Sequence, residues 1–437
     1  MQFLGSIIRK QAFLFFALFA VTGHAQVVDG NDNSPFTQIG IGDLSPSGFS
    51  RNQGMANTGV SMGSRYYINN INPALLVDTK LTIFEFGFQG RTRLINSNDG
   101  NQRNYGGNFN YVSLALPISK KVTVAAGFKP FSTIRYSSSS VYNISNAPGD
   151  TSLYTTASSG SGAISQVFLS GGYEINSNWS VGASASFLFG SVSDQSSIFT
   201  GIPVTYHFTN DYTNIVVLRS TVMNGYNLQG GLAYRKYILS EKYRINVGLT
   251  ASFASLFNSL NSTYLQKNAV SGGGSTYLTD TLTGNNPSIK LPSTFVIGAS
   301  INKGEQWTVG TDFTFQSFSN ETYRNSGSLQ NAFNWSLGGE FNPIYGKNVK
   351  GYLTRIVYRA GVYAGRTQYV ITGTPINDMG FTVGFGAPLG KLFSYVNLSG
   401  QFGTRGTVSN GLIQENYIKI NLGLNINDRW FIRPKVD

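Results

Sequence analysis

Cysteine is absent from the 437 residues, and charged residues are scarce. Without cysteine the chain has no disulfide, no thiolate metal ligand and no cysteine nucleophile. Charged residues make up 12% of the sequence, whereas a soluble domain usually has about 25%. Beyond the N-terminus, no segment has the roughly 18 consecutive apolar residues of a membrane-spanning helix. The composition is therefore typical neither of a soluble domain nor of a helical membrane protein.

Motifs for catalysis and metal binding are also missing. His207 is the only histidine after the N-terminal segment, and no serine stands in a nucleophile motif, so a Ser-His-Asp hydrolase is not indicated. The acidic residues do not have the spacing of metal ligands. No Gly-Lys pair follows the glycine run 272–274, which argues against a phosphate-binding loop. We predict a protein that is not an enzyme, with no catalytic residue, metal or cofactor, and interpret His207 as a strand or loop residue.

The first 25 residues have the three parts of a secretory signal peptide. A basic pair at residues 9 and 10 precedes the apolar run Ala12–Val21, and Gly23-His24-Ala25 is a small-x-small cleavage site. The apolar run is shorter than the about 20 residues that a spanning helix needs. We expect the chain to be exported and cleaved near Ala25.

Aromatic residues reach 14%, and from Lys80 onwards they take part in patterns of period two. In Tyr417–Ile426 every second residue is isoleucine or leucine, and the residues between them are polar or glycine, including Lys419. Phe84–Phe88 alternates in the same way. Such alternation predicts strands with one apolar and one polar face. A register slip of one residue would place Lys419 in lipid, at a cost of about 2–4 kcal/mol at the bilayer midplane.

These segments predict an all-β fold. Their number from Lys80 to the C-terminus is roughly 14, with lengths of about 9–11 residues or longer. The apolar faces are too aromatic and too numerous for the thin core of a soluble sandwich, the alternative fold. We therefore predict a transmembrane antiparallel β-barrel of about 14 strands in the outer membrane, with lipid outside and a polar lumen.

The connections between these segments are of two sizes. Short turns at 176–178, 240–242 and 302–304 suit the periplasmic side of a barrel. The stretches Ser137–Ser165 and Asn258–Pro287 are rich in serine, threonine and glycine. We expect them to be long loops on the cell surface, tilted over the barrel mouth or carrying extensions of the strands.

Gly48–Asp78 fits neither an apolar helix nor an alternating strand. Small residues recur through it and allow close approach of backbone to backbone. Its asparagines Asn69, Asn70 and Asn72 can satisfy peptide groups in a confined polar space. We predict that residues 26–79 form a periplasmic lead-in followed by a plug, or hatch, inside the lumen, and that residues 80–437 form the barrel.

Four charged residues fall on predicted polar faces of the wall: Glu85, Asp312, Arg355 and Arg359. Either they set the field of the lumen and hold the plug by salt bridges, or they are solvated wall charges without special partners. The net charge of +12 comes from scattered basic residues. We expect membrane lipid, lipopolysaccharide or anionic ligands as counter-charges, and no nucleic acid.

Two motifs carry a resemblance to a known family. Asn72-Pro73-Ala74 follows the glycine-rich Gly54–Gly63, and the run Leu291–Phe295 with Gly298 has the form Leu-Pro-x-x-Phe-x-x-Gly. Both resemble motifs of the FadL/TodX-type outer-membrane transporters, in which an N-terminal hatch plugs a barrel. The resemblance implies a channel for uptake of small hydrophobic compounds such as long-chain fatty acids. It also implies that Asn72, Pro73 and Ala74 lie at the moving part of the plug.

A second hypothesis is a docking or shuttle subunit similar to the PorV-type barrels of type 9 secretion, with an exported protein as its partner. The long polar surface stretches and the charged tail Asp428–Asp437 are compatible with it. A transporter needs an apolar pocket between plug and wall that reaches a lateral gap. A docking subunit needs a polar extracellular cleft or an exposed patch on its lipid face. The sequence does not choose between them.

Overall fold

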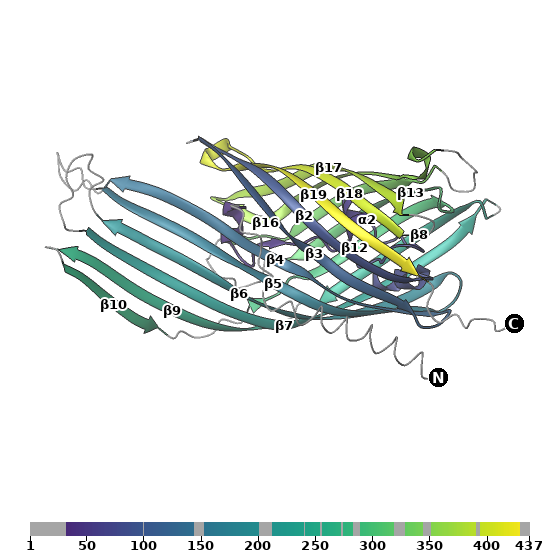
Figure 1. The fold of residues 1–437 in the computed structure, drawn as a ribbon, viewed down its shortest axis with the longest axis horizontal. Coiled ribbons are helices and arrows are strands. Elements are labelled where there is room, and N and C mark those ends of the chain that lie inside the picture. The colour runs from purple at the N-terminus through teal and green to yellow at the C-terminus, as the bar shows by residue number, and fades with distance from the viewer. Residues whose placement is uncertain are drawn as a thin grey trace.

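The computed structural model describes a barrel with segments of the chain inside it (Figure 1). The described ranges are 32–98, 100–143, 153–200, 212–239, 241–253, 256–271, 274–282, 289–318, 328–343, 351–389 and 394–428. The predicted signal peptide, His207 and residues 429–437 lie outside these ranges. No helix within them is long and apolar enough to cross a membrane.

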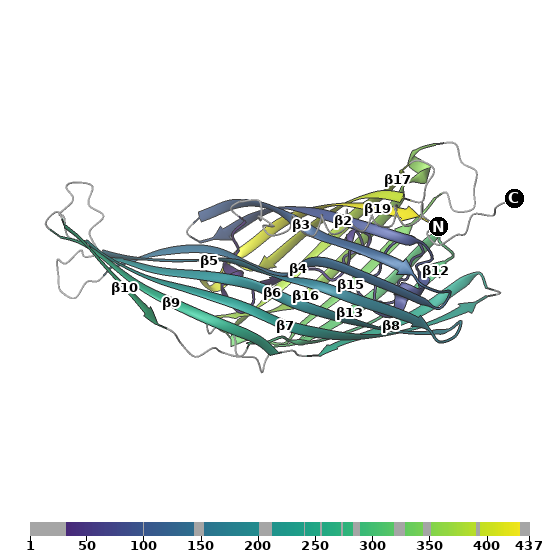
Figure 2. The ribbon, with the colours of Figure 1, turned by 60° about the horizontal axis from the view of Figure 1, so that its bottom comes forward.

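Among the described residues, fourteen antiparallel strands close into a ring (Figures 1 and 2). The ring closes because the last strand pairs with the first along Thr82–Asn96. The predicted fold class is therefore confirmed. In ring order the strands are β2 (Thr82–Ser97), β3 (Gly100–Pro117), β4 (Val122–Asn143), β5 (Leu153–Glu174), β6 (Trp179–Thr200), β7 (Tyr212–Ile238), β8 (Tyr243–Phe253), β12 (Ser293–Lys303), β13 (Trp307–Ser317), β15 (Ala332–Phe341), β16 (Val357–Ile371), β17 (Thr374–Leu389), β18 (Ser394–Gly406) and β19 (Gln414–Asp428).

Shorter elements complete the fold. Outside the ring, β9 follows β8 along the edge of β7, β10 and β11 pair with β9, and β14 pairs with β16. The helices are all short. The bounds of these elements are η2 (Pro35–Gln38), β1 (Asp43–Leu44), α2 (Ser50–Gln53), η3 (Pro73–Asp78), β9 (Leu256–Ser271), β10 (Gly274–Leu282), β11 (Ile289–Lys290), β14 (Ser328–Leu329), η4 (Leu353–Arg355) and η5 (Ser409–Gly411).

The strands are apolar on the outside and polar on the inside. On β19, the outward Ile420 is 54% exposed while the inward Asn421 is 2% exposed. Lys419 is on the inner face, where its ammonium group lies 4.8 Å from the ring centre of Tyr417. The outward positions of β8, such as Leu249, are likewise exposed. In a soluble protein the apolar side chains are buried and the polar ones exposed, and here the reverse holds, as expected for a barrel surrounded by lipid. The predicted register is therefore confirmed.

One end of the barrel carries short turns, and the other carries very long strands. β4, β5 and β6 have 22 residues each and β7 has 27, whereas about 9–11 residues cross a bilayer. Their far ends, with β9 and β10, form a sheet that projects beyond the ring (Figure 1). The described parts of Ser137–Ser165 and Asn258–Pro287, predicted as surface loops or as extensions of the strands, are strands. Serine and threonine tolerate extended backbone, and pairing across strands satisfies its N–H and C=O groups.

Candidate functional site

Residues 48–78, here called the inner segment, lie inside the ring. Their backbone or side chains contact wall strands on every side, from β5 round to β19. Phe49 stacks on Tyr111 of β3 with ring centres 4.1 Å apart, and both rings are buried. The segment singled out by the sequence therefore occupies the barrel interior.

Wall glycines make room for the inner segment. A Cβ added to Gly182 would lie 2.4 Å from the backbone nitrogen of Ala74, and one added to Gly248 would lie 2.0 Å from the carbonyl oxygen of Val60. A real Cβ atom is essentially never found this close to another residue's heavy atom, so only glycine fits at these positions without a shift of the backbone. The set, here called the glycine belt, consists of Gly172, Gly182, Gly231, Gly248, Gly298, Gly310, Gly338, Gly361, Gly384 and Gly423.

Two wall carboxylates bind the inner segment through its backbone. Asp312 Oδ2 accepts hydrogen bonds from the N–H groups of Gly59 and Val60 at 2.6 and 2.9 Å. Glu85 Oε1 accepts from the N–H of Ile68 at 3.0 Å and from Asn425 Nδ2 at 2.7 Å. The residues lie where the sequence placed them, but their bonds to the segment are hydrogen bonds to peptide groups rather than salt bridges.

A buried ion-pair network gives a further link. Glu340 of β15 pairs with Arg51 of α2 at 2.5 Å and with Arg359 of β16 at 3.2 Å. The Arg51 and Arg359 side chains are 3% and 1% exposed. Arg359 therefore lies on the lumen side, as predicted, and is connected to the inner segment through Glu340.

Arg355 differs from the prediction that placed it with Arg359 on one strand face. It lies in η4, is exposed, and precedes the start of β16 at Val357. The chain makes a 3₁₀ turn here because the Arg355 N–H bonds to the carbonyl of Tyr352, and this turn ends the strand period.

Asn72, Pro73 and Ala74 dock against β5, β6 and β7. Asn72 caps η3 by accepting from the Ala74 N–H at 3.0 Å. Its Nδ2 donates to the carbonyl of Val60 at 2.8 Å and to that of Leu232 in β7 at 3.1 Å. This motif is thus tied both to the inner segment and to the wall.

The wall has one seam with little strand pairing, between β3 and β4. These strands pair only from Val112 with Phe128 to Pro117 with Thr123, at the short-turn end. Within the described ranges, residues 100–111 of β3 and 129–143 of β4 do not pair with each other. In contrast, β4 and β5 pair from Val122 to Asn143.

Residues 32–47, here called the lead-in, cover this seam. On the β4 side, β1 pairs with Ser132 and Thr133, and the Ser45 N–H donates to the carbonyl of Phe131 at 2.9 Å. On the other side, Asn104 Nδ2 of β3 donates to the carbonyl of Asn33 at 3.1 Å. The lead-in was predicted to be periplasmic, but it lies in the half of the barrel opposite the short turns, because its polar groups bond to the wall there.

A charged cluster holds the lead-in to the wall. Arg405 of β18 contacts Asp43 at 2.7 Å and Glu415 of β19 at 2.6 Å. Glu415 also accepts a hydrogen bond from Ser34 Oγ at 2.5 Å. Arg93 of β2 lies 3.5 Å from Asp43. The lead-in is therefore attached to strands far from it in the sequence.

A small cavity lies between the lead-in, the inner segment and the wall. Its volume is about 140 Å³, and apolar side chains such as Leu44, Phe131 and Phe168 share its lining with a larger number of polar ones, among them Lys129 and Gln166. Next to it, residues on the inner faces of β4 to β7 form a buried apolar cluster with Ile41 of the lead-in and with Leu291. The cluster consists of Ile41, Ile134, Tyr136, Ile164, Leu188, Val192, Met223 and Leu291. An apolar cluster thus lies beside a cavity of mixed lining, close to the seam.

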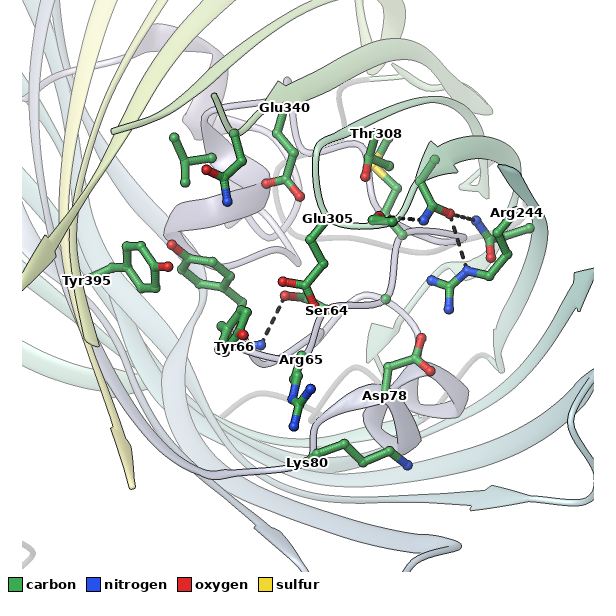
Figure 3. Close-up of a pocket in the computed structure, with 18 of the residues that line it drawn as sticks. Ser64, Arg65, Tyr66, Asp78, Lys80, Arg244, Glu305, Thr308, Glu340 and Tyr395 are labelled. Carbon is green, nitrogen blue, oxygen red and sulfur yellow. Dashed lines mark hydrogen bonds between the residues drawn. The ribbon is translucent and has the colours of Figure 1, made fainter. Parts of the chain in front are cut away.

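A second pocket, of about 390 Å³, opens at the short-turn end and has a different character. Charged side chains from the inner segment and the wall surround it, among them Arg65, Lys80, Arg244 and Glu305 (Figure 3). Burial raises the pKa of Glu305, which lies on the turn between β12 and β13. An apolar solute gains little from entering this pocket, because it would displace water from charged groups.

Among the described residues, no group of three or more His, Cys, Asp or Glu residues could hold a metal.

A family model described as BamG matches residues 7–437. The chain belongs to the BamG family.

No curated protein matches the sequence of this BamG-family chain. Several solved structures match its fold. A Pseudomonas aeruginosa FadL homologue has a TM-score of 0.58 and 12% identity over 88% of this chain and 99% of its own. The P. putida toluene transporter TodX has a TM-score of 0.55 and 14% identity, over 89% of this chain and 100% of its own. The CymD monoaromatic hydrocarbon channel has a TM-score of 0.54 and 17% identity, over 89% of this chain and 98% of its own.

These likenesses establish a FadL-like barrel fold for this BamG-family chain. The resemblance inferred from the two motifs is thus confirmed at the level of fold, while the matching family carries another name. A barrel of this kind belongs in the outer membrane.

Sequence reasoning missed the lead-in cluster and the glycine belt of this BamG-family chain. Asp43, Arg93, Arg405 and Glu415 stand in unrelated parts of the sequence, and no spacing connects them. Glycines at inward positions of alternating strands, such as Gly248, were a usable signal, because a lumen wall without side chains implies close contact with something inside.

The cluster predicts how the lead-in of this BamG-family chain responds to pH. Burial alone would raise the pKa of Asp43, but the guanidinium groups of Arg405, Arg93 and Arg91 hold it well below its usual range. A depressed pKa adds stability that is present above the unfolded value of about 3.9 and is lost only as pH falls through the folded value. The hydrogen-exchange protection factors of residues 34–45, which correct for the intrinsic pH dependence of exchange, should therefore be the same at pH 7 and pH 5.

Asp43→Asn should instead accelerate this exchange at pH 7 by roughly ten- to a hundredfold, because a charged hydrogen bond contributes about 1.5–3 kcal/mol. Glu241→Gln, on an exposed turn at the other end, is the control. Loss of protection between pH 7 and pH 5 in the unmodified protein would contradict this assignment.

Proposed function

We propose that this barrel conducts small hydrophobic compounds through the outer membrane and releases them sideways through the seam between β3 and β4. The observation that carries the proposal is the seam itself. A closed barrel wall is held by continuous strand pairing, whereas here a two-residue strand, β1, and a few side-chain bonds close the gap. Such a closure can open without breaking the ring elsewhere.

The lining of the interior supports the same route. The apolar cluster on β4 to β7 and the cavity beside Leu44 and Phe131 lead to the seam, while the pocket at the short-turn end is charged. An apolar solute that reaches the cavity is therefore better accommodated by lipid beside the seam than by the charged pocket. Long-chain fatty acids and monoaromatic hydrocarbons are the substrate classes we propose, the second because proteins of similar fold are described as toluene transporters and hydrocarbon channels.

The docking-subunit hypothesis remains the alternative, with an exported protein as partner. Among the described residues, no observation favours it over the channel. The route through the seam can be tested directly.

The test uses the absence of native cysteine. Leu44 of β1 and Ser132 of β4 are opposite each other, a geometry that suits a disulfide. In L44C/S132C, oxidation should reduce uptake of a labelled fatty acid or toluene to that of cells lacking the protein, because the lead-in can no longer leave the seam. Reduction should restore uptake.

The matched control is S170C/S184C. These residues are opposite each other on β5 and β6, with their hydroxyl oxygens 2.8 Å apart on the inner face. A disulfide there joins two strands that are already paired, and the lead-in remains free to leave the seam. Unchanged uptake with the oxidised L44C/S132C protein would refute release through the seam.

A further inference from the structure

We propose that the outer face of β17, β18, β19, β2 and β3 binds one phosphorylated glycolipid of the outer leaflet, lipopolysaccharide. This proposal concerns the lipid-facing surface and does not depend on transport. It rests on a hollow in that surface, on the polar border above it, and on one arginine at its edge.

The hollow has a volume of about 870 Å³ and lies beside the seam. Its floor and sides are mainly apolar and exposed: Met379 is 56%, Phe381 51% and Tyr105 57% exposed. Phe381 stacks on Phe402 with ring centres 5.0 Å apart, which forms one firm wall. An acyl chain is the kind of molecule that gains from filling such a space.

Small residues deepen the surface below this wall. One step nearer the short-turn end, the strands place Gly400, Ile420, Gly90 and Gly107 side by side on the outer face. A Cβ added to Gly90 would meet nothing within 4 Å. The outer surface is therefore low at Gly90, next to the hollow, whereas the ring of Phe402 lies 3.2 Å from a Cβ built at Gly400.

Polar side chains appear at the upper edge of the hollow. Thr404, Asn416 and Arg103 lie there in one row with the apolar Met379 and Leu94, directly above the row that contains Phe402 and Ile418. Thr404 Oγ1 and Asn416 Oδ1 are 2.8 Å apart. An increase in polar side chains from one row to the next is expected at the level of the lipid headgroups.

Arg103 supplies the charge. It is exposed, and within the described ranges it has no ion-pair partner. A guanidinium group binds phosphate through paired N–H donors, and Thr404 and Asn416 offer groups that bind sugar hydroxyls. The site is at the end of the barrel opposite the short turns, and this end faces the cell exterior. Lipopolysaccharide is the lipid of the outer leaflet that combines several acyl chains with sugars and phosphates.

Native mass spectrometry of the full chain tests this proposal. The protein is extracted from nanodiscs that contain equal amounts of lipopolysaccharide and phosphatidylglycerol. One retained lipopolysaccharide per chain is expected. Arg103→Gln should lower retention about fivefold, as expected for one basic residue at an anionic surface. Thr92→Phe, which fills the middle of the hollow, should lower it at least as much.

The control variant is Arg366→Gln. Arg366 is on β16, outside the hollow, with its guanidinium carbon 4.9 Å from the ring centre of Phe333. Its removal should leave retention unchanged, and heat-dependent gel migration should show that all variants form barrels. Equal retention of both lipids, or an equal loss in Arg103→Gln and Arg366→Gln, would overturn the proposal.

Discussion

Gly231→Val is expected to drive the inner segment out of its position or to prevent the barrel from closing around it. A Cβ at Gly231 would lie 2.3 Å from Asn72 Oδ1 and 2.9 Å from the ring of Pro73. Overpacking a well-packed core costs about 1–3 kcal/mol and sometimes more, and here Asn72 also loses its contacts with Val60 and β7. Limited proteolysis should then cleave within residues 48–78, which should be protected in the unmodified protein because most of them are buried inside the barrel.

The neighbouring Gly230→Val is the matched control. A Cβ at Gly230 meets nothing within 4 Å, because this residue faces outward, and valine is well suited to a strand. The control should keep the protection of residues 48–78 and the migration of a folded barrel. Equal behaviour of the two variants would mean that the glycine belt does not hold the inner segment.

Glu340→Gln is expected to lower the free energy of unfolding by about 3–5 kcal/mol, because it leaves the buried guanidinium groups of Arg51 and Arg359 without a counter-charge. Urea unfolding of the barrel in lipid vesicles measures this change. The loss should appear as a lower midpoint, since the exposed surface on unfolding is similar.

Glu174→Gln provides the comparison at the surface. Glu174 lies 3.8 Å from Lys80, and both side chains are partly exposed, so the loss should not exceed about 1 kcal/mol. If the two variants lose the same small amount, the network around Glu340 is solvated and does not anchor the inner segment.

The wall of this barrel could be predicted from the sequence because one physical rule governs it. Lipid outside and a polar lumen inside impose period two, so the faces of Tyr417–Ile426 and of Ile245–Phe253 follow from their side chains alone. The extra length of β4 to β7 could not be read in this way. Beyond the membrane both faces meet water, and the alternation that marks a strand disappears.

The interior could be predicted only in outline. Asparagines and small residues identify the inner segment, yet its partners depend on which strand lies opposite. Asp43 meets Arg405 only because the barrel brings β18 next to the lead-in. Arg355 shows the converse error: two arginines four residues apart suggest one strand face, and a 3₁₀ turn separates them.

The contacts also change which segment is expected to move. The resemblance to FadL/TodX-type transporters implied motion of Asn72, Pro73 and Ala74, but these residues are buried against the glycine belt. The lead-in, in contrast, covers the only seam among the described strands. We therefore expect the lead-in to open while the inner segment stays in place.

Photoaffinity labelling tests this account most directly. The purified chain in nanodiscs is irradiated with a long-chain fatty acid that carries a diazirine near the end of its chain, and labelled peptides are identified by mass spectrometry. The account predicts labels on residues 41–47 and 129–135, at the two sides of the seam. Labels concentrated around Arg65 and Glu305, in the pocket at the short-turn end, would contradict it.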